Sequence, residues 1–206
     1  MATFDNVSAQ RLSMMVTSKV VPLFYQLLGH GFCVNVQTGS SVRELLCNQL
    51  GIDEDYLDQR IKSIFLNGKV VDDVDTAIVG KDATMALSGA MPGLVGAILR
   101  SGGFYAPMRS QISHEKNKSP SQHKQGTITL KLLNLVVREL GPTFLQQGVL
   151  IQRKEIRSFI DRHAEALMRE CLAVELQDTP VEVASLRKAD WETDLVFLLV
   201  KSGPAS

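Results

Sequence analysis

The first ninety residues carry short apolar runs in which apolar and polar positions alternate, a pattern that is typical of strands. Residues 19–27 are apolar and rich in β-branched and aromatic side chains, and a glycine-flanked turn separates them from the alternating residues 32–37. Two adjacent runs of this kind predict a β-hairpin. Pro22 restricts the first strand to an edge or a bulge, and a helix over residues 10–28 is the alternative.

One helix is predicted after this hairpin. Ser41 and Glu44 have the spacing of a capping box, in which the serine hydroxyl binds the amide of the residue three positions later. Apolar residues then recur at helical spacing as far as Gly51, and glycine commonly ends a helix. Residues 53–59 are acidic and have no regular pattern, which predicts an irregular connection.

A second hairpin and a final strand complete the pattern of the first half. Asn67 and Gly68 lie between apolar runs at 61–66 and 69–71, and an Asn-Gly pair favours a two-residue turn because both positions need a positive φ. Residues 83–87 alternate again. The order hairpin, helix, hairpin, strand predicts one helix packed on one face of a small mixed sheet, which is an α+β fold.

Three segments of this half resemble the ubiquitin-like β-grasp sulfur carriers, a family that includes the small subunit of molybdopterin synthase and the thiamine-pathway sulfur carrier. The segments are VQTGSSVRELLCNQLGI, IFLNGKVVDD and VDTAIVGKDATMAL, which fall in that family's order and spacing within residues 16–93. The resemblance implies a β-grasp fold over this part of the chain. It also implies a terminal Gly-Gly tail that accepts sulfur, whereas Gly102 and Gly103 are internal here. Carrier function therefore requires cleavage after Gly103.

The second half of the chain predicts helices first and strands later. Residues 127–140 are dense in leucine and valine around most of a helix, and Gly141 with Pro142 is expected to stop or kink that helix. A second helix is predicted over residues 155–171. Strands are predicted over 181–186 and 195–201, with 172–176 as a further candidate. This half is expected to be a helix-helix-strand α+β domain.

A polar, basic stretch separates the two halves. Residues 111–126 hold no apolar side chain after Ile112 and three lysines against one acid, so they cannot bury enough surface to offset the entropy of ordering. We therefore expect a β-grasp domain over residues 1–110, a linker over 111–126 and an α+β domain over 127–206.

Composition and charge exclude several classes of function. Hydrophobic residues make up 45% of the 206, and the formal net charge is zero, so no global attraction to nucleic acid or an anionic membrane exists. Three widely separated cysteines without a CxxC pair favour a reducing compartment over a disulfide framework or a zinc site. No secretory signal is visible at the N-terminus, so the expectation is a cytoplasmic protein.

Residues 86–105 combine five glycines and a proline with apolar side chains. The stretch lacks the lysine and spacing of a phosphate-binding loop, and its apolar run is too short and interrupted for a membrane span. We expect a packed turn followed by a short helix or strand, with a protein-docking surface as the alternative. The residues of that candidate surface are Met91, Leu94, Val95, Ile98 and Leu99. The candidate anion contact is Arg100 with Arg109.

No catalytic constellation is recognisable in the sequence. Asp161, His163 and Glu165 alternate along a predicted helix, so the histidine cannot share a face with the two acids, and no nucleophile motif occurs. The predicted function is a non-enzymatic protein that binds a protein partner or forms a homo-oligomer, with no cofactor, metal, nucleic acid or membrane. A sulfur-carrier precursor processed after Gly103 is the first alternative. An enzyme with a site between two domains is the second.

Overall fold

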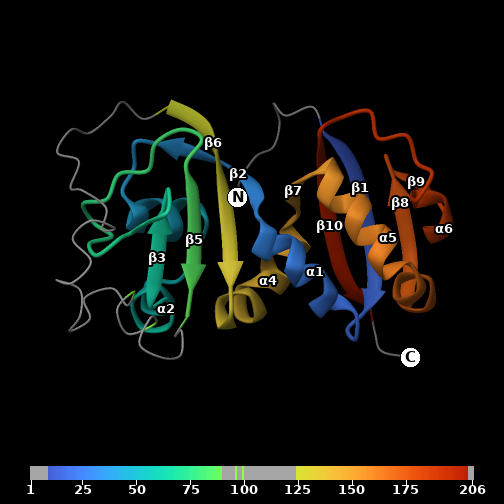
Figure 1. Cartoon of the computed structure of the whole chain (residues 1–206), viewed down its shortest axis with the longest axis horizontal. Coiled ribbons are helices and arrows are strands. Elements are labelled where there is room, and N and C mark those ends of the chain that lie inside the picture. The colour runs from blue at the N-terminus through green and yellow to red at the C-terminus, as the bar shows by residue number, and fades with distance from the viewer. Residues whose placement is uncertain (1–8, 90–95, 97–98, 100–123, 204–206) are drawn as a thin grey trace. The chain divides into compact units, whose positions relative to one another are not determined.

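The chain divides into two compact units, each with its own set of strands (Figure 1). The computed structural model describes residues 9–89, 96, 99 and 124–203. Of these, unit 1 contains 33–89, 96, 99 and 124–137, and unit 2 contains 9–32 and 138–203. The mixture of helices and strands confirms the α+β class. The boundaries between the units do not lie at the expected linker, residues 111–126. Instead, the chain passes from one unit to the other after Phe32 and after Val137.

Unit 1 contains a mixed sheet with one central parallel pair. Its elements are β2 (Phe32–Thr38), the π-helix η1 (Glu44–Gln49), α2 (Glu54–Arg60), β3 (Ser63–Leu66), β4 (Lys69–Val70), β5 (Thr84–Ser88) and β6 (Lys124–Leu133). The strand order is β4-β3-β5-β6-β2 (Figure 1). Strand β5 runs parallel to β6 and antiparallel to β3, which forms a hairpin with β4.

Unit 2 contains a second mixed sheet, covered on one face by a long helix. Its elements are β1 (Gln10–Thr17), α1 (Val21–His30), β7 (Val149–Gln152), α5 (Arg153–Glu170), β8 (Cys171–Leu176), β9 (Thr179–Pro180), α6 (Val183–Leu186) and β10 (Leu195–Gly203). Helix α4 (Leu135–Gln147) begins in unit 1 and ends in unit 2. The strand order is β7-β10-β1-β8-β9, with β1 parallel to β10 and antiparallel to β8.

The two sheets share one arrangement, in which β4, β3, β5, β6 and β2 correspond to β9, β8, β1, β10 and β7. Both hairpins turn through two residues of positive φ, one at Asn67 and the other at Gln177. The Asn67 amide donates to the Thr84 carbonyl at 2.8 Å, and the Thr84 amide donates to Asn67 Oδ1 at 2.9 Å. The Gln177 amide and Oε1 make the same two bonds with Arg11, each at 2.9 Å. Thr84 of β5 and Arg11 of β1 therefore occupy equivalent positions.

Each unit takes one central strand from the other half of the chain. The first half runs β1-α1-β2-η1-α2-β3-β4-β5, and the second runs β6-α4-β7-α5-β8-β9-α6-β10, so both halves follow the order strand, helix, strand, helix, hairpin, strand. Strand β1, although N-terminal, lies between β8 and β10, and β6 lies between β5 and β2. The first strand of each half is thus built into the unit that holds the other half's later strands.

The opening hairpin predicted from the sequence is wrong, and so is the first part of the alternative helix over residues 10–28. Residues 21–30 form helix α1, and the strand before it is β1, which buries Leu12, Met14 and Val16 and pairs with β8 and β10 rather than with β2. Pro22 stands in the first turn of α1, where no intrahelical bond requires its missing N–H. The second predicted strand is confirmed as β2, whose alternate apolar residues are buried.

The helix predicted after β2 begins as expected but winds differently. The Ser41 hydroxyl accepts a hydrogen bond from the Glu44 amide at 3.2 Å, as the capping pattern requires. The bond from the Leu50 amide to the Leu45 carbonyl spans five residues, which makes η1 a π-helix. The acidic stretch that follows is α2 rather than an irregular connection, because the Asp53 carboxylate accepts from the Tyr56 amide at 2.9 Å and caps the helix.

The helix predicted over residues 127–140 is largely wrong. The chain forms strand β6 first, and α4 begins only at Leu135. Alternate residues of β6 are buried, namely Ile128, Leu130 and Leu132. The expected stop at Gly141 does not occur, since α4 continues through Pro142. A Cβ on Gly141 would lie 3.2 Å from Leu28 and Tyr25, so glycine allows α1 to approach α4 closely.

The remaining elements of the second half follow the sequence pattern more closely. The second predicted helix is confirmed as α5, and the strands predicted over 172–176 and 195–201 are confirmed as β8 and β10. The strand predicted over residues 181–186 is wrong, because this segment forms the short helix α6 after the hairpin strand β9. Helix α5 lies on the unit 2 sheet (Figure 1), where it buries Ile156, Phe159, Ile160 and Leu167.

Candidate functional site

The two sheets differ most in their outer faces, which we define as the faces opposite the buried side chains. Thr84 pairs with Thr129 in unit 1, and the equivalent Arg11 pairs with Phe197 in unit 2. Position by position along β6 and β10, Thr129 therefore corresponds to Phe197, and Lys131 corresponds to Leu199. At these positions the outer face of unit 1 is polar and that of unit 2 is apolar, whereas the next outer position holds Leu133 in unit 1 and Lys201 in unit 2.

The outer face of unit 2 carries five apolar side chains that are partly exposed. We call this set the apolar face, and its residues are Met15, Leu172, Leu195, Phe197 and Leu199. Met15 is 43% exposed and Leu172 is 47% exposed. Gly203 leaves room for both, because a Cβ at that position would lie 2.5 Å from Leu172 Cδ1 and 3.5 Å from Met15 Cγ. Apolar side chains that gather on a surface in this way mark sites of protein association.

Phe197 is the most firmly held member of the apolar face. Its ring covers Gly148, whose φ of 92° and lack of a Cβ leave space for the aromatic edge. The Arg11 guanidinium lies 5.8 Å from the ring centroid, a distance at which a cation and an aromatic face attract. The Phe197 ring is therefore held in place at this end of the apolar face by its contacts with Gly148 and Arg11.

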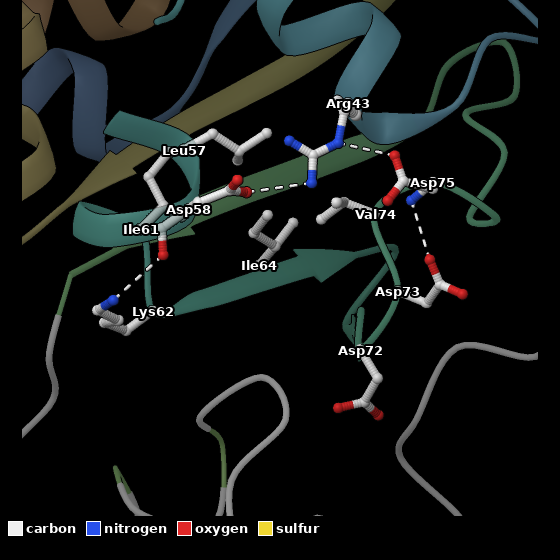
Figure 2. Close-up of a pocket in the computed structure, with 10 residues that line it drawn as sticks. All are labelled: Arg43, Leu57, Asp58, Ile61, Lys62, Ile64, Asp72, Asp73, Val74 and Asp75. Carbon is white, nitrogen blue, oxygen red and sulfur yellow. Dashed lines mark hydrogen bonds and ion pairs between the residues drawn. The ribbon is translucent and has the colours of Figure 1, made fainter. Parts of the chain in front are cut away.

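A pocket of unit 1 with a volume of about 400 Å³ lies beside Arg43 (Figure 2). Arg43 Nε donates to Asp75 at 2.7 Å, and Arg43 Nη2 donates to Asp58 at 3.1 Å. Both carboxylates raise the pKa of the arginine, whose side chain is 28% exposed. Arg43 links η1 and α2 to the loop after β4, and its charge is already neutralised by two aspartates. The pocket is therefore not prepared to bind an anion.

The acidic turn that follows β4 is held by its own hydrogen bonds. Asp73 Oδ1 accepts from the amides of Asp75 and Thr76 at 3.0 and 3.3 Å, which is the geometry of an aspartate turn. Asp72 points away from Arg43 (Figure 2). Within the described ranges, no group of histidine, cysteine and carboxylate side chains is arranged to hold a metal ion. The hydrogen bonds within the turn give Asp73 a structural role.

None of the three thiols is activated for nucleophilic chemistry. Burial raises the pKa of Cys33, Cys47 and Cys171, so less thiolate is present at neutral pH than for a free cysteine. Hydrogen bonding with Thr129 and with the Ala173 backbone lowers the pKa of Cys33 and Cys171, respectively, by less than burial raises it. The cysteines are free and half-buried.

His163 belongs to a hydrogen-bonded link between α1 and α5 rather than to a catalytic cluster. Arg162 Nη1 donates to Gln26 Oε1 at 2.8 Å, so the Gln26 amide nitrogen faces His163 Nε2, 2.6 Å away. The His163 nitrogen must then accept, which requires a neutral ring. Burial and the Arg162 charge both lower the pKa of His163. The backbone of α5 departs from helical geometry at this residue, with φ −111° and ψ 15°.

Most of the residues singled out in the glycine-rich stretch lie outside the described residues. These are Met91, Leu94, Val95, Ile98, Arg100, Gly102, Gly103 and Arg109. Leu99 is described, is half-buried, and accepts a hydrogen bond on its carbonyl from the Ser63 hydroxyl at 2.9 Å. Gly89 is packed, since a Cβ there would lie 3.4 Å from Leu135 Cβ. The anion contact and the carrier tail remain predictions.

The apolar face and the Arg43 pocket are not among the sites predicted from the sequence. A signal for the first exists in residues 195–201, where apolar side chains occupy both parities of the strand rather than one. Nothing local marks Arg43, because its partners Asp58 and Asp75 are 15 and 32 residues away.

Comparison with known proteins returns no relatives: no family model, no curated protein and no solved structure matches the chain. In the described part of the chain, no helix is both long enough and apolar enough to cross a membrane.

Proposed function

We propose that the protein is non-enzymatic and works by self-association, a second copy of the chain binding to the apolar face of unit 2. One observation carries the proposal. The same sheet is present twice, and the outer-face positions filled by Thr129 and Lys131 in unit 1 are filled by Phe197 and Leu199 in unit 2. The fold does not require apolar side chains there, because unit 1 forms the same sheet without them.

The charges that border the apolar face favour a second copy as its partner. Lys201 pairs with Met15 on one side of β1, and Glu175 pairs with Ser13 on the other side, so both charges lie on the outer face. A two-fold axis that runs parallel to β1 between two facing copies places the β10 side of one copy, with Lys201, over the β8 side of the other copy, with Glu175. The face is thus complementary to itself, which a symmetric dimer interface requires.

We also propose that unit 1 is a β-grasp domain with a rearranged chain order. The expected helix, short hairpin and last strand are present after β2. The strand that should precede β2 in a β-grasp hairpin is absent from that place in the sequence, and β6 lies next to β2 instead. The support for this proposal is the strand order β4-β3-β5-β6-β2 with its parallel central pair.

The two alternatives gain no support from the described residues. Cleavage after Gly103 would cut the covalent connection between β5 and β6, although β6 lies between β5 and β2 in the sheet. A carrier produced in this way would lack a central strand or would remain bound to the second half of the chain. For an enzyme, none of the described thiols is activated, and the two arginines proposed for its site lie outside the described residues.

Sedimentation of the purified chain at micromolar concentration tests the proposal. The expected species has twice the mass of the 22.7 kDa chain. Leu199→Lys, which installs the residue that unit 1 carries at the equivalent position, should weaken the dimer by at least about a hundredfold, because one apolar contact is lost from each of two copies.

The matched control is Lys131→Ala, which removes the corresponding side chain from the polar outer face of unit 1. It should leave the dissociation constant unchanged. A wild-type chain that sediments as a monomer overturns the proposal of self-association. A dimer that Leu199→Lys does not weaken places the interface somewhere other than on the apolar face.

A further inference from the structure

Strand β1 is bonded into unit 2 along its whole length. It pairs with β10 from Gln10 to Thr17, and on its other side it pairs with β8 from Leu12 to Val16, with a bulge after Met15. Its inner side chains Leu12, Met14 and Val16 are buried. A central strand with two partners contributes more hydrogen bonds and more buried surface than an edge strand, so unit 2 is incomplete without β1.

The N-terminal end of β1 also fixes the segment around Trp191, the single tryptophan of the chain. Gln10 Nε2 donates to the Asp190 carbonyl at 3.2 Å, and the Glu192 amide donates to Gln10 Oε1 at 2.8 Å. The Gln10 amide donates to Thr193 Oγ1 at 3.0 Å. Trp191 itself is 1% exposed. A residue near the start of the sequence therefore holds a buried tryptophan near its end.

Strand β6 fills the central slot between β5 and β2 in unit 1. The Thr127 hydroxyl donates to Asn35 Oδ1 of β2 at 3.1 Å, and the Asn134 amide group donates to the Ser88 hydroxyl at 2.9 Å. The Thr38 hydroxyl donates to the Lys124 carbonyl at 2.9 Å. Bonds to both neighbouring strands anchor the two ends of β6, which contributes the buried side chains Ile128, Leu130 and Leu132.

We infer that the two halves of the chain, the first ending with β5 and the second beginning with β6, are mutual binding partners that assemble by reciprocal strand exchange. The slot between β8 and β10 takes β1 of the first half, and the slot between β5 and β2 takes β6 of the second. Strand complementation holds the halves together, and the covalent connection between β5 and β6 is not needed for it. This inference does not depend on the proposed dimer.

Cutting that connection in the folded full-length chain tests the inference. A protease site is introduced between Leu99 and Lys124, the protein is cut to completion as judged on a denaturing gel, and the products are passed through a native sizing column. The two fragments should elute together at the position of the uncut protein. Fragments that elute separately without denaturant overturn the inference.

A substitution in β1 tests whether the first half truly completes unit 2. Met14→Asp buries an unpaired carboxylate between β1 and α5, and it should weaken the association of the cut halves by at least about a hundredfold. The same cut protein carrying Leu199→Lys should stay assembled, because that residue lies on the outer face. Leu199→Lys therefore reports on the proposed dimer, and Met14→Asp reports on the association of the two halves.

Gln10→Ala provides a milder test that does not require cutting and leaves the core intact. Loss of its two side-chain bonds to the segment around Trp191 should increase quenching of the tryptophan by acrylamide severalfold in the folded chain. The matched control is Gln37→Ala in β2, whose side chain is exposed; it should leave the quenching unchanged. Equal quenching of the Gln10 and Gln37 variants overturns the placement of β1 in unit 2.

Discussion

In unit 1, the outer-face residues Thr127, Thr129 and Lys131 of the central strand β6 are polar, and the corresponding residues Leu195, Phe197 and Leu199 of β10 in unit 2 are apolar; the next outer position reverses the contrast, with Leu133 in unit 1 and Lys201 in unit 2. The inner faces do not differ in this way, since Ile128, Leu130 and Leu132 of β6 and Val196, Leu198 and Val200 of β10 are all apolar and buried. The inner face is constrained by the core that the sheet must cover, whereas the outer face is constrained only by what it meets outside the unit. The comparison teaches that the fold can be kept while one face is adapted to a partner.

The largest expected effect comes from breaking the distinction between inner and outer positions. Leu130→Asp places an unpaired charge in the core of unit 1 and should lower the free energy of unfolding by more than about 3 kcal/mol. Its outer-face neighbour Thr129→Asp should cost less than about 1 kcal/mol. Urea unfolding measures both, and similar losses for the two variants would contradict the assignment of the faces.

A smaller effect is expected from exchanging equivalent outer-face residues. Phe197→Thr copies unit 1 into unit 2 and should lower the free energy of unfolding by about 1–3 kcal/mol, because the ring packs on Gly148 and beneath Arg11. The reverse change, Thr129→Phe, should alter it by less than about 1 kcal/mol. If Phe197→Thr is neutral in thermal and urea unfolding, the aromatic residue serves association alone.

Acid should distinguish the two units, because the described histidines His30 and His163 both lie in unit 2. The pKa of His163 is lowered in the folded state, so the unfolded chain binds the extra proton first. The stability contributed by the neutral ring is fully present above the unfolded pKa of about 6.5 and is lost as the pH falls below it.

The measurement compares one reporter in each unit between pH 7.5 and pH 5.5. Acrylamide quenching of Trp191 reports on unit 2, and thiol labelling at Cys47, read by mass spectrometry, reports on unit 1. Quenching should increase at the lower pH, and labelling corrected for thiolate concentration should not. The control variant His163→Gln should remove the part of the pH dependence that this histidine causes. An unchanged pH profile in that variant would assign the effect to another group.

The smallest expected effect concerns the hairpin turns, where Gly68 in unit 1 corresponds to Asp178 in unit 2. Both residues have positive φ, at 78° and 58°, a conformation that costs an L-residue more than glycine. Asp178→Gly should raise the free energy of unfolding by up to about 1 kcal/mol, and Gly68→Ala should lower it by about 1 kcal/mol. Differential scanning calorimetry detects both changes. A destabilised Asp178→Gly variant would show that the 3.9 Å pair with Arg11 outweighs the strain.

Local features of the fold were predictable from the sequence, and those set by distant partners were not. The Asn67 turn and the Ser41 cap depend on residues within four positions of each other, and both are confirmed. Residues 127–140 contain leucines at helical and at alternating spacing, so the pattern alone does not choose between helix and strand. The choice is made by β5 and β2, which leave a slot for β6 between them.

The candidate site shows the same limit. The apolar side chains at 195–201 were visible in the sequence, but their meaning depends on which of them face α5 and which face outward. That assignment requires the pairing of β10 with β1, whose residues lie more than 180 positions away. The exposure of Leu172 beside Met15 likewise follows from a pairing between segments at opposite ends of the chain.

The pairing of β1 with β10 also constrains how the protein is made. β1 leaves the ribosome more than 180 residues before its parallel neighbour β10. The apolar side chains of β1 therefore lack this neighbour until β10 has been synthesised. Folding that depends on a contact between residues so far apart in the sequence is slow, and the unpaired strands can aggregate in the meantime. During translation the nascent chain is therefore a natural client for chaperones that hold apolar strands, and unit 2 can be completed only after β10 has left the ribosome.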